Sequence, residues 1–397
     1  MENVWTENGP AAFSLDTKPL VAYTFHLINK RQLSNYLPRR TCGKDPMPET
    51  MKKAVIIGPK QIEIIDVDVP RPGPGEVLVK VLSIGICGSD LHYYAGDQIG
   101  DRDINYPMSL GHEFAGDIAE VGPGVTSVKP GDRIVAEPAL GCGECEWCKA
   151  GKVNLCPECK FCGSPPVDGA LSQYYVLTEH QAVKVPDDMS YDAALMSEPL
   201  ANLIHAFGMC RFEPGDTAGI IGCGPIGLLL MQLVRRAEPS EIYVAEKVGY
   251  RLEHARRLGA DVCIDADAKD AAEEILALTG GRGVDLALEA AGDLQAIGQC
   301  IEVAKRGGFV LIEGIPGETT IPFDIRTARR KELTLQLCRR CPDPPNEALR
   351  MIHEGEIDVD SLITHHFPIS EAAHAYRLVY DYTDGAVKVI VNPWPEA

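Results

Sequence analysis

Residues 217–227 read TAGIIGCGPIG, and this stretch decides the fold of the chain. Its first five residues are small or apolar and predict a buried strand, whereas PIGLLLMQLVRRA, from Pro225 onward, predicts a helix. The pattern Gly222-x-Gly224-x-x-Gly227 lies at the turn between them. Glycines at these places permit a tight turn and let backbone N–H groups at a helix N-terminus approach a pyrophosphate closely. We therefore predict a dinucleotide-binding strand–helix–strand unit.

The alternation of strands and helices continues through residues 199–337. EIYVAE, DVCID, VDLALEAAG and GGFVLIEG predict strands, and YRLEHARRLGA and AAEEILALTG predict helices. Continuous apolar strands that alternate with helices are typical of a parallel sheet with helices on both faces. We expect residues 199–337 to form a doubly wound α/β domain of the Rossmann type.

The residues that precede this domain have another pattern. VLVKVLSIG, FAGDIAEVG, RIVAEP and YYVLTEHQAVKVP are short strand-like segments broken by Gly and Pro, which favours a closed or partly closed β-barrel over 51–198. Residues 338–397 return to mixed character, and we expect them to complete this first domain. Residues 1–50 sustain no periodic pattern and are predicted to be a poorly structured extension.

Length and composition limit the classes of function. The chain has 397 residues, and at roughly 150 residues a domain this predicts two to three domains. Its 38 basic and 57 acidic residues give a net charge of −19, which disfavours nucleic acid and anionic membranes as partners. The start, MENVWTENGP, lacks the basic and apolar regions of a signal peptide, so we expect a cytoplasmic location.

The cofactor prediction follows from residues around the glycine turn. Glu246 closes the next strand, where a carboxylate accepts hydrogen bonds from adenosine ribose hydroxyls and repels a 2′-phosphate, so we predict NAD rather than NADP. Arg251 could accommodate that phosphate, but beside Glu246 we expect it to support the ribose or adenine of NAD. The predicted cofactor-binding residues are Gly222, Gly224, Pro225, Ile226, Gly227, Glu246, Arg251, Gly314 and Ile315.

A loop of clustered cysteines predicts a metal site. Cys142, Cys145, Cys148 and Cys156 supply four thiolates at a spacing that suits tetrahedral zinc, and a closed four-sulfur site has a structural role. An iron–sulfur cluster also takes four thiolates, but its bacterial motif has three residues before the last cysteine, not seven. Two further cysteines, Cys159 and Cys162, could in principle exchange as ligands.

A second metal site is predicted from Cys87 in CGSDLHYY and His112 in GHEF. Cysteine and neutral histidine are common zinc ligands, and an incomplete protein ligand set leaves a coordination position for catalysis. Either residue alone is more often a packed core residue. Their occurrence together with a nucleotide fold and a cysteine loop favours the catalytic interpretation.

At this point the sequence resembles a known family. From Met51 to its end the chain is similar to the zinc-dependent medium-chain dehydrogenases, and within them to the polyol branch of sorbitol (L-iditol) and xylitol dehydrogenases. The motifs that carry the resemblance are CGSDLHYY from residue 87, GHEFAGDIAEVG from 111, GDR at 131–133, the cysteine loop, SEPL at 197–200, the glycine pattern and ITHHFPISEAAHAY at 363–376. It implies a GroES-like β-barrel catalytic domain joined to the Rossmann domain.

The resemblance also implies roles for individual residues. Cys87, His112, Glu113 and Glu198 correspond to the surroundings of the catalytic zinc, and whether Glu113 or Glu198 ligates the metal directly stays open. Asp90 corresponds to the carboxylate that orients His112. Ser89 and His92 correspond to a relay that takes the alcohol proton to solvent through the nicotinamide ribose.

The predicted reaction is oxidation of a secondary hydroxyl of a polyol to a ketose. Zinc lowers the pKa of an oxygen that it binds toward about 7, so hydride can pass from the alkoxide carbon to C4 of the nicotinamide. Tyr93 and Arg339 match substrate-contacting positions of the polyol branch, but Arg340 and Pro342 replace the aromatic and Asn residues usual there. The same chemistry on 2,3-butanediol or L-threonine is the alternative, and a non-catalytic nucleotide-binding relative is a remote one. Relatives are dimers and tetramers, so we expect a homo-oligomer, with the tetramer favoured.

Overall fold

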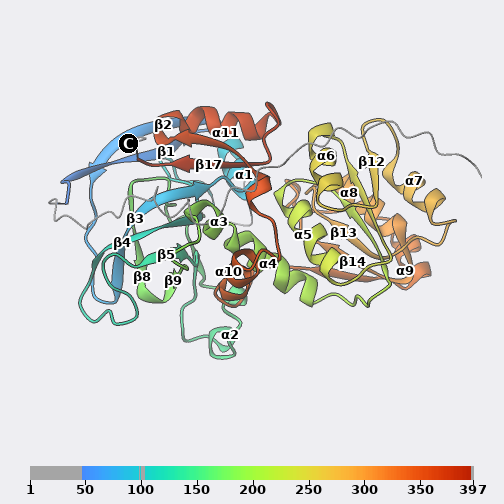
Figure 1. The fold of residues 1–397 in the computed structure, drawn as a ribbon, viewed down its shortest axis with the longest axis horizontal. Helices are drawn as coiled ribbons and strands as arrows, with labels where there is room; N and C mark the ends of the chain where they lie inside the picture. The colour runs from blue at the N-terminus through green and yellow to red at the C-terminus, as the bar shows by residue number, and fades with distance from the viewer. Residues whose placement is uncertain (1–46, 98, 100–102, 395–397) are drawn as a thin grey trace, which may run out of the picture. The chain divides into compact units, whose positions relative to one another are not determined.

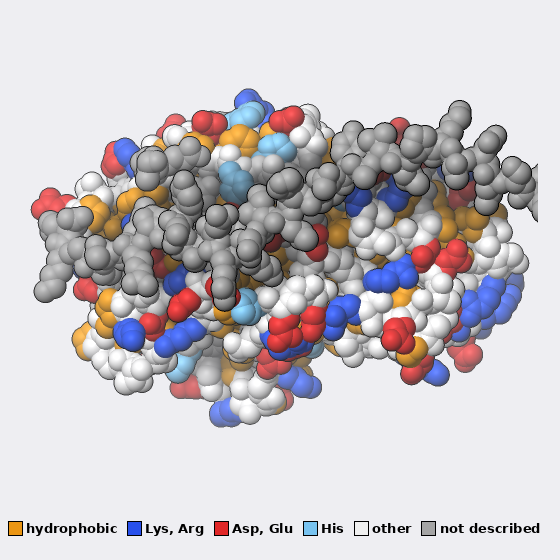
Figure 2. Space-filling view, in the orientation of Figure 1, with side chains coloured by type: hydrophobic (Ala, Val, Ile, Leu, Met, Phe, Trp, Pro, Cys, Tyr) orange, Lys and Arg blue, Asp and Glu red, His pale blue; other side chains and the backbone are white. Residues whose placement is uncertain are grey.

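The fold is described from a computed structural model, which covers residues 47–97, 99 and 103–394. The predicted extension, residues 1–50, therefore lies outside the described residues except for its last four. Among the helices that are described, none is long and apolar enough to cross a membrane. Where the face in Figure 2 is described, acidic and basic side chains are interspersed among uncharged ones.

The described chain opens with an antiparallel hairpin of β1 (Thr50–Gly58) and β2 (Gln61–Asp68). The apolar, β-branched stretch that begins at Met51 thus forms the strand that the sequence predicts. Ile56 is buried and its N–H donates to the carbonyl of Met108 at 2.7 Å. This bond ties the hairpin to the segment that leads to His112.

A seven-stranded sheet forms the centre of the β-rich domain (Figure 1). Its order is β16-β17-β3-β4-β5-β9, and β8 also pairs with β3. Only the β16–β17 pair is parallel. The strands are β3 (Glu76–Gly85), β4 (Glu113–Val121), β5 (Arg133–Ala136), β8 (Tyr174–Thr178), β9 (Ala182–Lys184), β16 (Ile363–Pro368) and β17 (Lys388–Asn392). Buried Phe114 and Val391 of this sheet share a core with Tyr376 of α11 (Ala372–Tyr380). The predicted β-rich fold class of this region is confirmed.

One expected strand is divided in two. The sequence predicts a single strand over 174–186, but the chain leaves the sheet after Thr178 and forms the 3-10 turn η3 (Glu179–Gln181) before β9. The reason is local, because the amide oxygen of Gln181 accepts hydrogen bonds from the N–H of Thr178 at 3.2 Å and from its hydroxyl at 3.1 Å. This side chain offers the backbone an alternative to the sheet ladder. β9 then pairs with β5 instead of β3.

The nucleotide-binding part contains a six-stranded sheet in which every neighbouring pair is parallel. The order is β12-β11-β10-β13-β14-β15, where the strands are β10 (Thr217–Ile221), β11 (Glu241–Glu246), β12 (Val262–Asp265), β13 (Val284–Glu289), β14 (Ala304–Ile312) and β15 (Thr334–Leu337). The helices are α5 (Pro225–Arg236), α6 (Gly249–Arg257), α7 (Ala271–Leu278), α8 (Leu294–Val303) and α9 (Ile325–Lys331).

Helices cover both faces of this sheet. Consecutive residues of a strand point to opposite faces. Ile220 accordingly packs in the core that holds Leu228 of α5, and Ile221 packs in another core with Ile275 of α7 and Cys300 of α8. The predicted doubly wound α/β arrangement is confirmed.

After β15 the chain returns to the first sheet through α10 (Asn346–His353), η4 (Asp360–Leu362), β16, η5 (Ile369–Glu371), α11 and β17. Leu349 of α10 lies in one apolar core with Leu203 of α4 (Ser197–Gly208) and Leu228 of α5. α3 (Tyr191–Leu195) contributes Leu195 to the same core. This shared core fixes the start of α4, which carries Glu198, relative to the loop that follows β15.

Candidate active site and metal centres

Three predicted ligands lie together where two strands of the first sheet meet a helix. Cys87 precedes α1 (Gly88–Ala95), and Glu113 is the first residue of β4, directly after His112. The ligand atoms of Cys87, His112 and Glu113 all lie within 4.8 Å of one another. His112 and Glu113 are buried. Residues 25 positions apart in the sequence thus form one cluster, because β3 and β4 are antiparallel neighbours.

Asp90 holds this cluster in place. One carboxylate oxygen accepts a hydrogen bond from the N–H of Cys87 at 3.1 Å, and the other faces Nδ1 of His112 at 3.4 Å. The second oxygen also accepts from the N–H of Gly111 at 3.4 Å. Burial alone would lower the pKa of His112, but the charges of Asp90 and Cys87 and hydrogen bonds with both together outweigh it, so the pKa lies well above its ordinary value.

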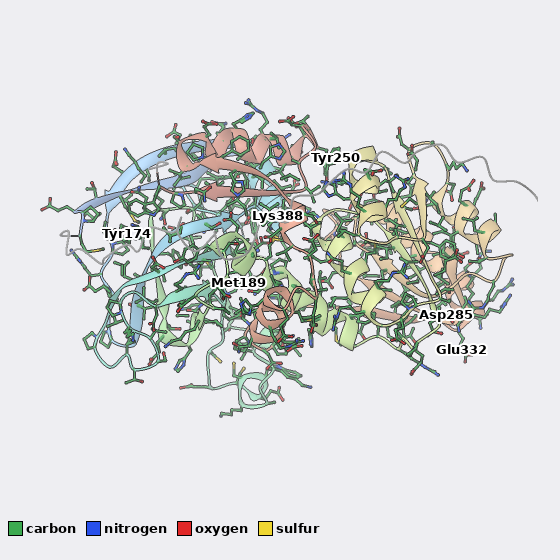
Figure 3. All side chains as sticks on the ribbon, viewed as in Figure 1. Tyr174, Met189, Tyr250, Asp285, Glu332 and Lys388 are labelled. Carbon is green, nitrogen blue, oxygen red and sulfur yellow. The ribbon has the colours of Figure 1, made fainter. Side chains whose placement is uncertain are left out.

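Lys388 is a member of this cluster that sequence reasoning missed. Its ammonium group forms an ion pair with the carboxylate of Glu113, and both side chains are almost fully buried. The ammonium also donates to the carbonyl of Ile86 at 3.2 Å. Lys388 begins β17, which pairs with β3 near Gly85 (Figure 3). Since Lys388 is 275 positions from Glu113, no local spacing could have indicated the pair.

Glu198 approaches the cluster from α4. It is buried, and burial raises the pKa of its carboxyl group, with Glu113 also raising it and His112 lowering it. Its Oε1 accepts a hydrogen bond from the side-chain amide of Asn202 at 3.1 Å. The amide oxygen of Asn202 accepts from the N–H of Cys341 at 2.7 Å. Asn202, one helical turn beyond Glu198, is a second residue that sequence reasoning did not identify.

The donor chemistry of this centre fits zinc. A thiol, an imidazole and two buried carboxyl groups are ligands that zinc accepts, and three protein ligands leave a position for a further oxygen ligand. Buried carboxylates are costly without a cation nearby. Lys388 supplies one positive charge near the two buried carboxyl groups of Glu113 and Glu198. A metal ion would supply the further positive charge that two carboxylates need.

The cysteine loop forms a second cluster. The sulfur atoms of Cys142, Cys145, Cys148 and Cys156 all lie within 4.8 Å of one another. Tetrahedral zinc with bonds of about 2.3 Å needs sulfur atoms about 3.8 Å apart, so this cluster fits the ion. The loop contains the short helices α2 (Glu146–Lys149) and η2 (Val153–Leu155).

Backbone N–H groups point at these sulfur atoms, as thiolates require. Cys145 N–H donates to Cys142 Sγ, and Cys148 N–H to Cys145 Sγ, both at 3.4 Å. Hydrogen bonds from backbone N–H groups lower the pKa of Cys142 to about 7. The other two cysteines of the region, Cys159 and Cys162, lie outside the four-sulfur group. The thiol of Cys159 donates a hydrogen bond to the carbonyl of Lys160 at 3.6 Å, and the buried thiol of Cys162 donates to the carbonyl of Gly111 at 3.4 Å.

The glycine turn leaves no room for side chains at two of its three glycines. A Cβ on Gly222, whose φ is +101°, would lie 2.6 Å from the backbone nitrogen of Ala291, and one on Gly227 would lie 1.9 Å from the carbonyl oxygen of Gly222. A Cβ on Gly224 would meet only the guanidinium of Arg251, at 3.7 Å. Gly224 caps α5, and Pro225 and Ile226 are its first residues. The open surface at Gly224 is where a pyrophosphate fits the helix N-terminus.

Glu246 and Arg251 lie beside this turn. The carboxylate of Glu246 accepts hydrogen bonds from the N–H groups of Cys223 at 2.7 Å and Val248 at 2.9 Å. Arg251 is buried and its Nε has no hydrogen-bond partner among the described residues. Its guanidinium lies 4.7 Å from the ring centroid of Tyr382. A buried donor without an acceptor beside the glycine turn fits a role in binding the adenosine part of a dinucleotide.

The remaining predicted residues lie on α1 and on the loops after β14 and β15. The imidazole Nε2 of His92 lies 3.1 Å from the carbonyl oxygen of Ile315, which follows Gly314 at the carboxyl end of β14. The hydroxyl of Ser89 makes no hydrogen bond within the described residues. Tyr93 is buried and its hydroxyl lies 2.9 Å from that of Ser164, whereas Arg339 is exposed. α1 thus faces the cofactor loop through His92.

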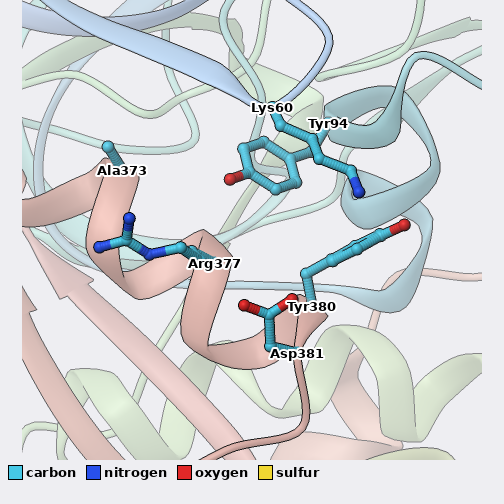
Figure 4. A pocket seen from close by; sticks show the side chains of 6 residues that line it. All are labelled: Lys60, Tyr94, Ala373, Arg377, Tyr380 and Asp381. Atoms are coloured by element: carbon cyan, nitrogen blue, oxygen red, sulfur yellow. The ribbon is translucent and has the colours of Figure 1, made fainter.

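A small hollow lies elsewhere on the β-rich domain, with a volume of about 230 Å³. Lys60, Tyr94, Arg377, Tyr380 and Asp381 line it together with Ala373 (Figure 4). The ammonium of Lys60 lies 4.1 Å from the ring centroid of Tyr380. None of the predicted site residues lines this hollow.

Comparison with known proteins agrees with this arrangement. Residues 73–187 match the alcohol dehydrogenase GroES-like domain, and residues 225–354 match the zinc-binding dehydrogenase family. The chain is 36% identical to sorbitol dehydrogenase of Bacillus subtilis, over 87% of this chain and 98% of that protein. It is 34% identical to D-arabitol-phosphate dehydrogenase of Enterococcus avium, over 88% of this chain and 99% of that protein. The crystal structure of 2R,3R-butanediol dehydrogenase from B. subtilis superimposes with a TM-score of 0.78 at 31% identity, over 87% of this chain and all of that one.

The first of these family matches includes Cys87, His112, Glu113 and the four clustered cysteines, and the second includes the helix that follows the glycine turn. Dependence on zinc and on a nicotinamide dinucleotide is typical of the matched families. The predictions of fold class, of enzyme class, and of zinc and a nicotinamide dinucleotide as cofactors are thereby confirmed. The chain belongs to the zinc-binding dehydrogenases with a GroES-like domain, and within them it groups with enzymes that act on alcohols and polyols.

Proposed function

We propose that this enzyme oxidises a secondary hydroxyl of a polyol to a ketone, with NAD as the hydride acceptor and zinc as the metal. The observation that carries the proposal is the cluster of Cys87, His112 and Glu113 within 4.8 Å, on the domain whose α1 contacts the cofactor loop through His92. The resemblance to sorbitol dehydrogenase supports the polyol as substrate class.

Cys87, His112 and Glu113 would hold the catalytic zinc, whereas Glu198 lies outside the group whose ligand atoms are within 4.8 Å of one another and would act on the metal through a water molecule. Zinc would lower the pKa of the substrate hydroxyl and NAD would accept the hydride. Asp90 keeps the imidazole of His112 in position by facing its Nδ1, so that Nε2 is free for the metal. Lys388 holds Glu113 by its ion pair, which fixes the carboxylate while compensating its charge.

Proton transfer completes the reaction. The hydroxyl of Ser89, which is free of hydrogen bonds within the described residues, would take the proton of the substrate hydroxyl and pass it toward His92. The products are the ketone, NADH and one proton, so charge and electrons balance. The contact between His92 and the carbonyl of Ile315 supports a relay that runs along the cofactor loop.

The four-cysteine cluster would hold a second, structural zinc ion. Its four sulfur ligands leave no position for substrate, so its contribution is to the stability of the loop. The carboxylate of Glu246 beside the glycine turn supports NAD over NADP, because a 2′-phosphate there would meet a negative charge.

A homo-oligomer, with the tetramer favoured, is the assembly that we propose. β15 lies at one edge of the six-stranded sheet, and its last residue, Leu337, is 65% exposed. Ile325 of the neighbouring α9 is 62% exposed. An apolar sheet edge of this kind supports pairing of two subunits across a two-fold axis. Analytical ultracentrifugation would measure the assembly directly.

The decisive experiment combines metal analysis with a panel of substrates. The purified enzyme should contain two zinc ions per chain and reduce NAD with sorbitol, xylitol, arabinitol or threitol. A chelator that removes one zinc ion should abolish turnover without unfolding the protein. Higher kcat/KM with 2,3-butanediol or L-threonine would favour those substrates, and binding of NADH without any turnover would indicate a non-catalytic relative.

A further inference from the structure

Arg340 lies beside the candidate active site on a loop that is fixed from two sides. The side-chain amide of Asn154 donates to the carbonyls of Arg339 at 2.9 Å and Arg340 at 3.4 Å. On the other side the N–H of Cys341 donates to Asn202, which in turn donates to Glu198. Arg340 itself has φ of +54°, a left-handed conformation that is uncommon outside glycine and recurs at functional sites.

The side chain of Arg340 reaches toward the catalytic cluster. Its guanidinium carbon lies 3.6 Å from the ring centroid of Phe161, on β7 (Lys160–Phe161), which pairs with β6 (Ala139–Leu140). The same ring lies 5.0 Å, centroid to centroid, from the imidazole of His112. Phe161 therefore contacts both the predicted zinc ligand and the guanidinium.

This guanidinium has no ion pair. Within the described ranges no carboxylate oxygen lies within 4.0 Å of Arg340, and its one polar side-chain contact is Cys159 Sγ, at 3.9 Å from Nη1. Burial lowers the pKa of the Arg340 guanidinium, and the more distant Glu198 and Tyr93 raise it. Burial raises the pKa of Glu137, and Arg340 lowers it. Arg339, the neighbour that sequence matching indicated as a substrate contact, is exposed instead.

A half-buried guanidinium without a carboxylate partner is suited to an oxyanion. Its five N–H donors form a planar fork that matches carboxylate and phosphate groups with two parallel hydrogen bonds. Stacking on Phe161 fixes the plane of the fork and leaves its N–H edge available. A neutral polyol offers only hydroxyl groups, which compensate the desolvated charge less well.

We propose that the preferred substrate is a polyol that carries an oxyanion, either a phosphate ester or a carboxylate, and that Arg340 binds this group. The inference rests on the proposed function, since it assigns the substrate class of the same site. Arg340 is then a residue that determines specificity, and the anionic group lies at the end of the substrate remote from the carbon that is oxidised.

The test compares matched substrates on the zinc-loaded enzyme with NAD. kcat/KM is measured for xylitol, xylitol 5-phosphate and xylonate, and for sorbitol, sorbitol 6-phosphate and gluconate. We expect the phosphate ester or the acid to exceed its neutral counterpart by roughly 10- to 100-fold, mainly through KM. Which of the two anions is preferred distinguishes phosphate from carboxylate as the ligand.

Variants separate a specific contact from general attraction. Arg340→Met should reduce the anionic-to-neutral ratio of kcat/KM to within about threefold of unity, and Arg340→Lys, which keeps the charge but loses the fork, should give an intermediate ratio. Lys160→Met removes an exposed positive charge next to Phe161 and is the matched control, which should leave the ratio unchanged within about twofold. Circular dichroism checks that each variant is folded.

The outcomes also separate this inference from the proposed function. Turnover of neutral polyols with no preference for the anionic ones, or a ratio that Arg340→Met does not alter, would overturn the role of Arg340 while the dehydrogenase assignment stands. If neither neutral nor anionic polyols reduce NAD, the proposed function itself is wrong and the inference falls with it.

Discussion

The ammonium group of Lys388 pairs with the carboxylate of Glu113 in the interior of the protein, where their side chains are only 2% and 1% exposed. Three strands meet at this pair, since Glu113 begins β4, Lys388 begins β17, and the carbonyl that Lys388 also contacts belongs to Ile86, the residue that directly follows β3. Cys87 follows directly. The ion pair thus connects the stability of the sheet to the position of a predicted zinc ligand.

Removing one member of this pair should destabilise the protein strongly. Lys388→Met leaves the carboxylate of Glu113 buried without a partner, at a cost of about 3–5 kcal/mol. If Glu113 contacts the metal, zinc replaces part of the lost positive charge. Thermal unfolding measures how far Lys388→Met lowers Tm below that of the unmodified protein in the same metal state. This decrease should be larger without metal than with zinc bound. The double variant Lys388→Met/Glu113→Gln is the control and should recover part of the loss; equal decreases in both metal states would argue that Glu113 does not contact zinc.

The cysteine cluster should account for one of two zinc ions. Cys142→Ser removes a sulfur ligand, so metal analysis should show one zinc ion per chain in place of two, and Tm should fall by several degrees because metal binding no longer stabilises the loop. Cys159→Ser changes a nearby cysteine outside the cluster and should retain both ions. Loss of zinc from Cys159→Ser would show instead that the ligand set is different.

Charge at Glu246 should set the choice of nicotinamide cofactor. Glu246→Ser removes the carboxylate next to Arg251, and the ratio of kcat/KM for NADP to that for NAD should rise by roughly tenfold or more. Because Glu246 also accepts hydrogen bonds from Cys223 and Val248, activity with both cofactors should decline. Glu246→Gln keeps an acceptor for one of these N–H groups but has no charge, and so separates the two effects. An unchanged ratio in both variants would contradict the predicted contact with the ribose.

Asp285 should make the stability of the parallel sheet depend on pH. Burial raises the pKa of Asp285, but hydrogen bonds from Arg282, Lys305 and Thr217 outweigh it and hold the pKa well below the ordinary value. A carboxyl group whose pKa is lower in the folded than in the unfolded protein stabilises the fold at pH values above its unfolded pKa of about 3.9. This contribution is lost as the pH falls from there toward the folded pKa.

The difference in Tm between the unmodified protein and Asp285→Asn measures this contribution. It should be constant from pH 7 to about pH 5 and decrease below about pH 4. Asp66→Asn is the control, because Asp66 and its partner Lys52 are more than half exposed and such pairs contribute little. A difference that stays the same down to pH 3 would mean that the charge of Asp285 is not what stabilises the sheet.

The sequence by itself determined those features that depend on residues only a few positions apart in the chain. The glycines of the turn at 222–227, the carboxylate at Glu246 and the four-cysteine loop lie where they were predicted, because backbone geometry over a few residues depends on those residues alone. The strand expected over 174–186 was wrong in one respect. A side-chain hydrogen bond from Thr178 to Gln181 turned the chain out of the sheet, and the hydrophobic pattern gave no sign of it.

Only the tertiary structure decided which distant side chains meet. The pairing of Lys388 with Glu113, the bridge from Glu198 through Asn202 to Cys341, and the stacking of Arg340 on Phe161 each join segments far apart in the chain. Arg340, which has a left-handed backbone conformation, is partly buried, whereas its neighbour Arg339 is exposed. Such contacts depend on how strands pair and helices pack. Pairing and packing are set by interactions throughout the core, which the spacing of residues along the sequence does not indicate.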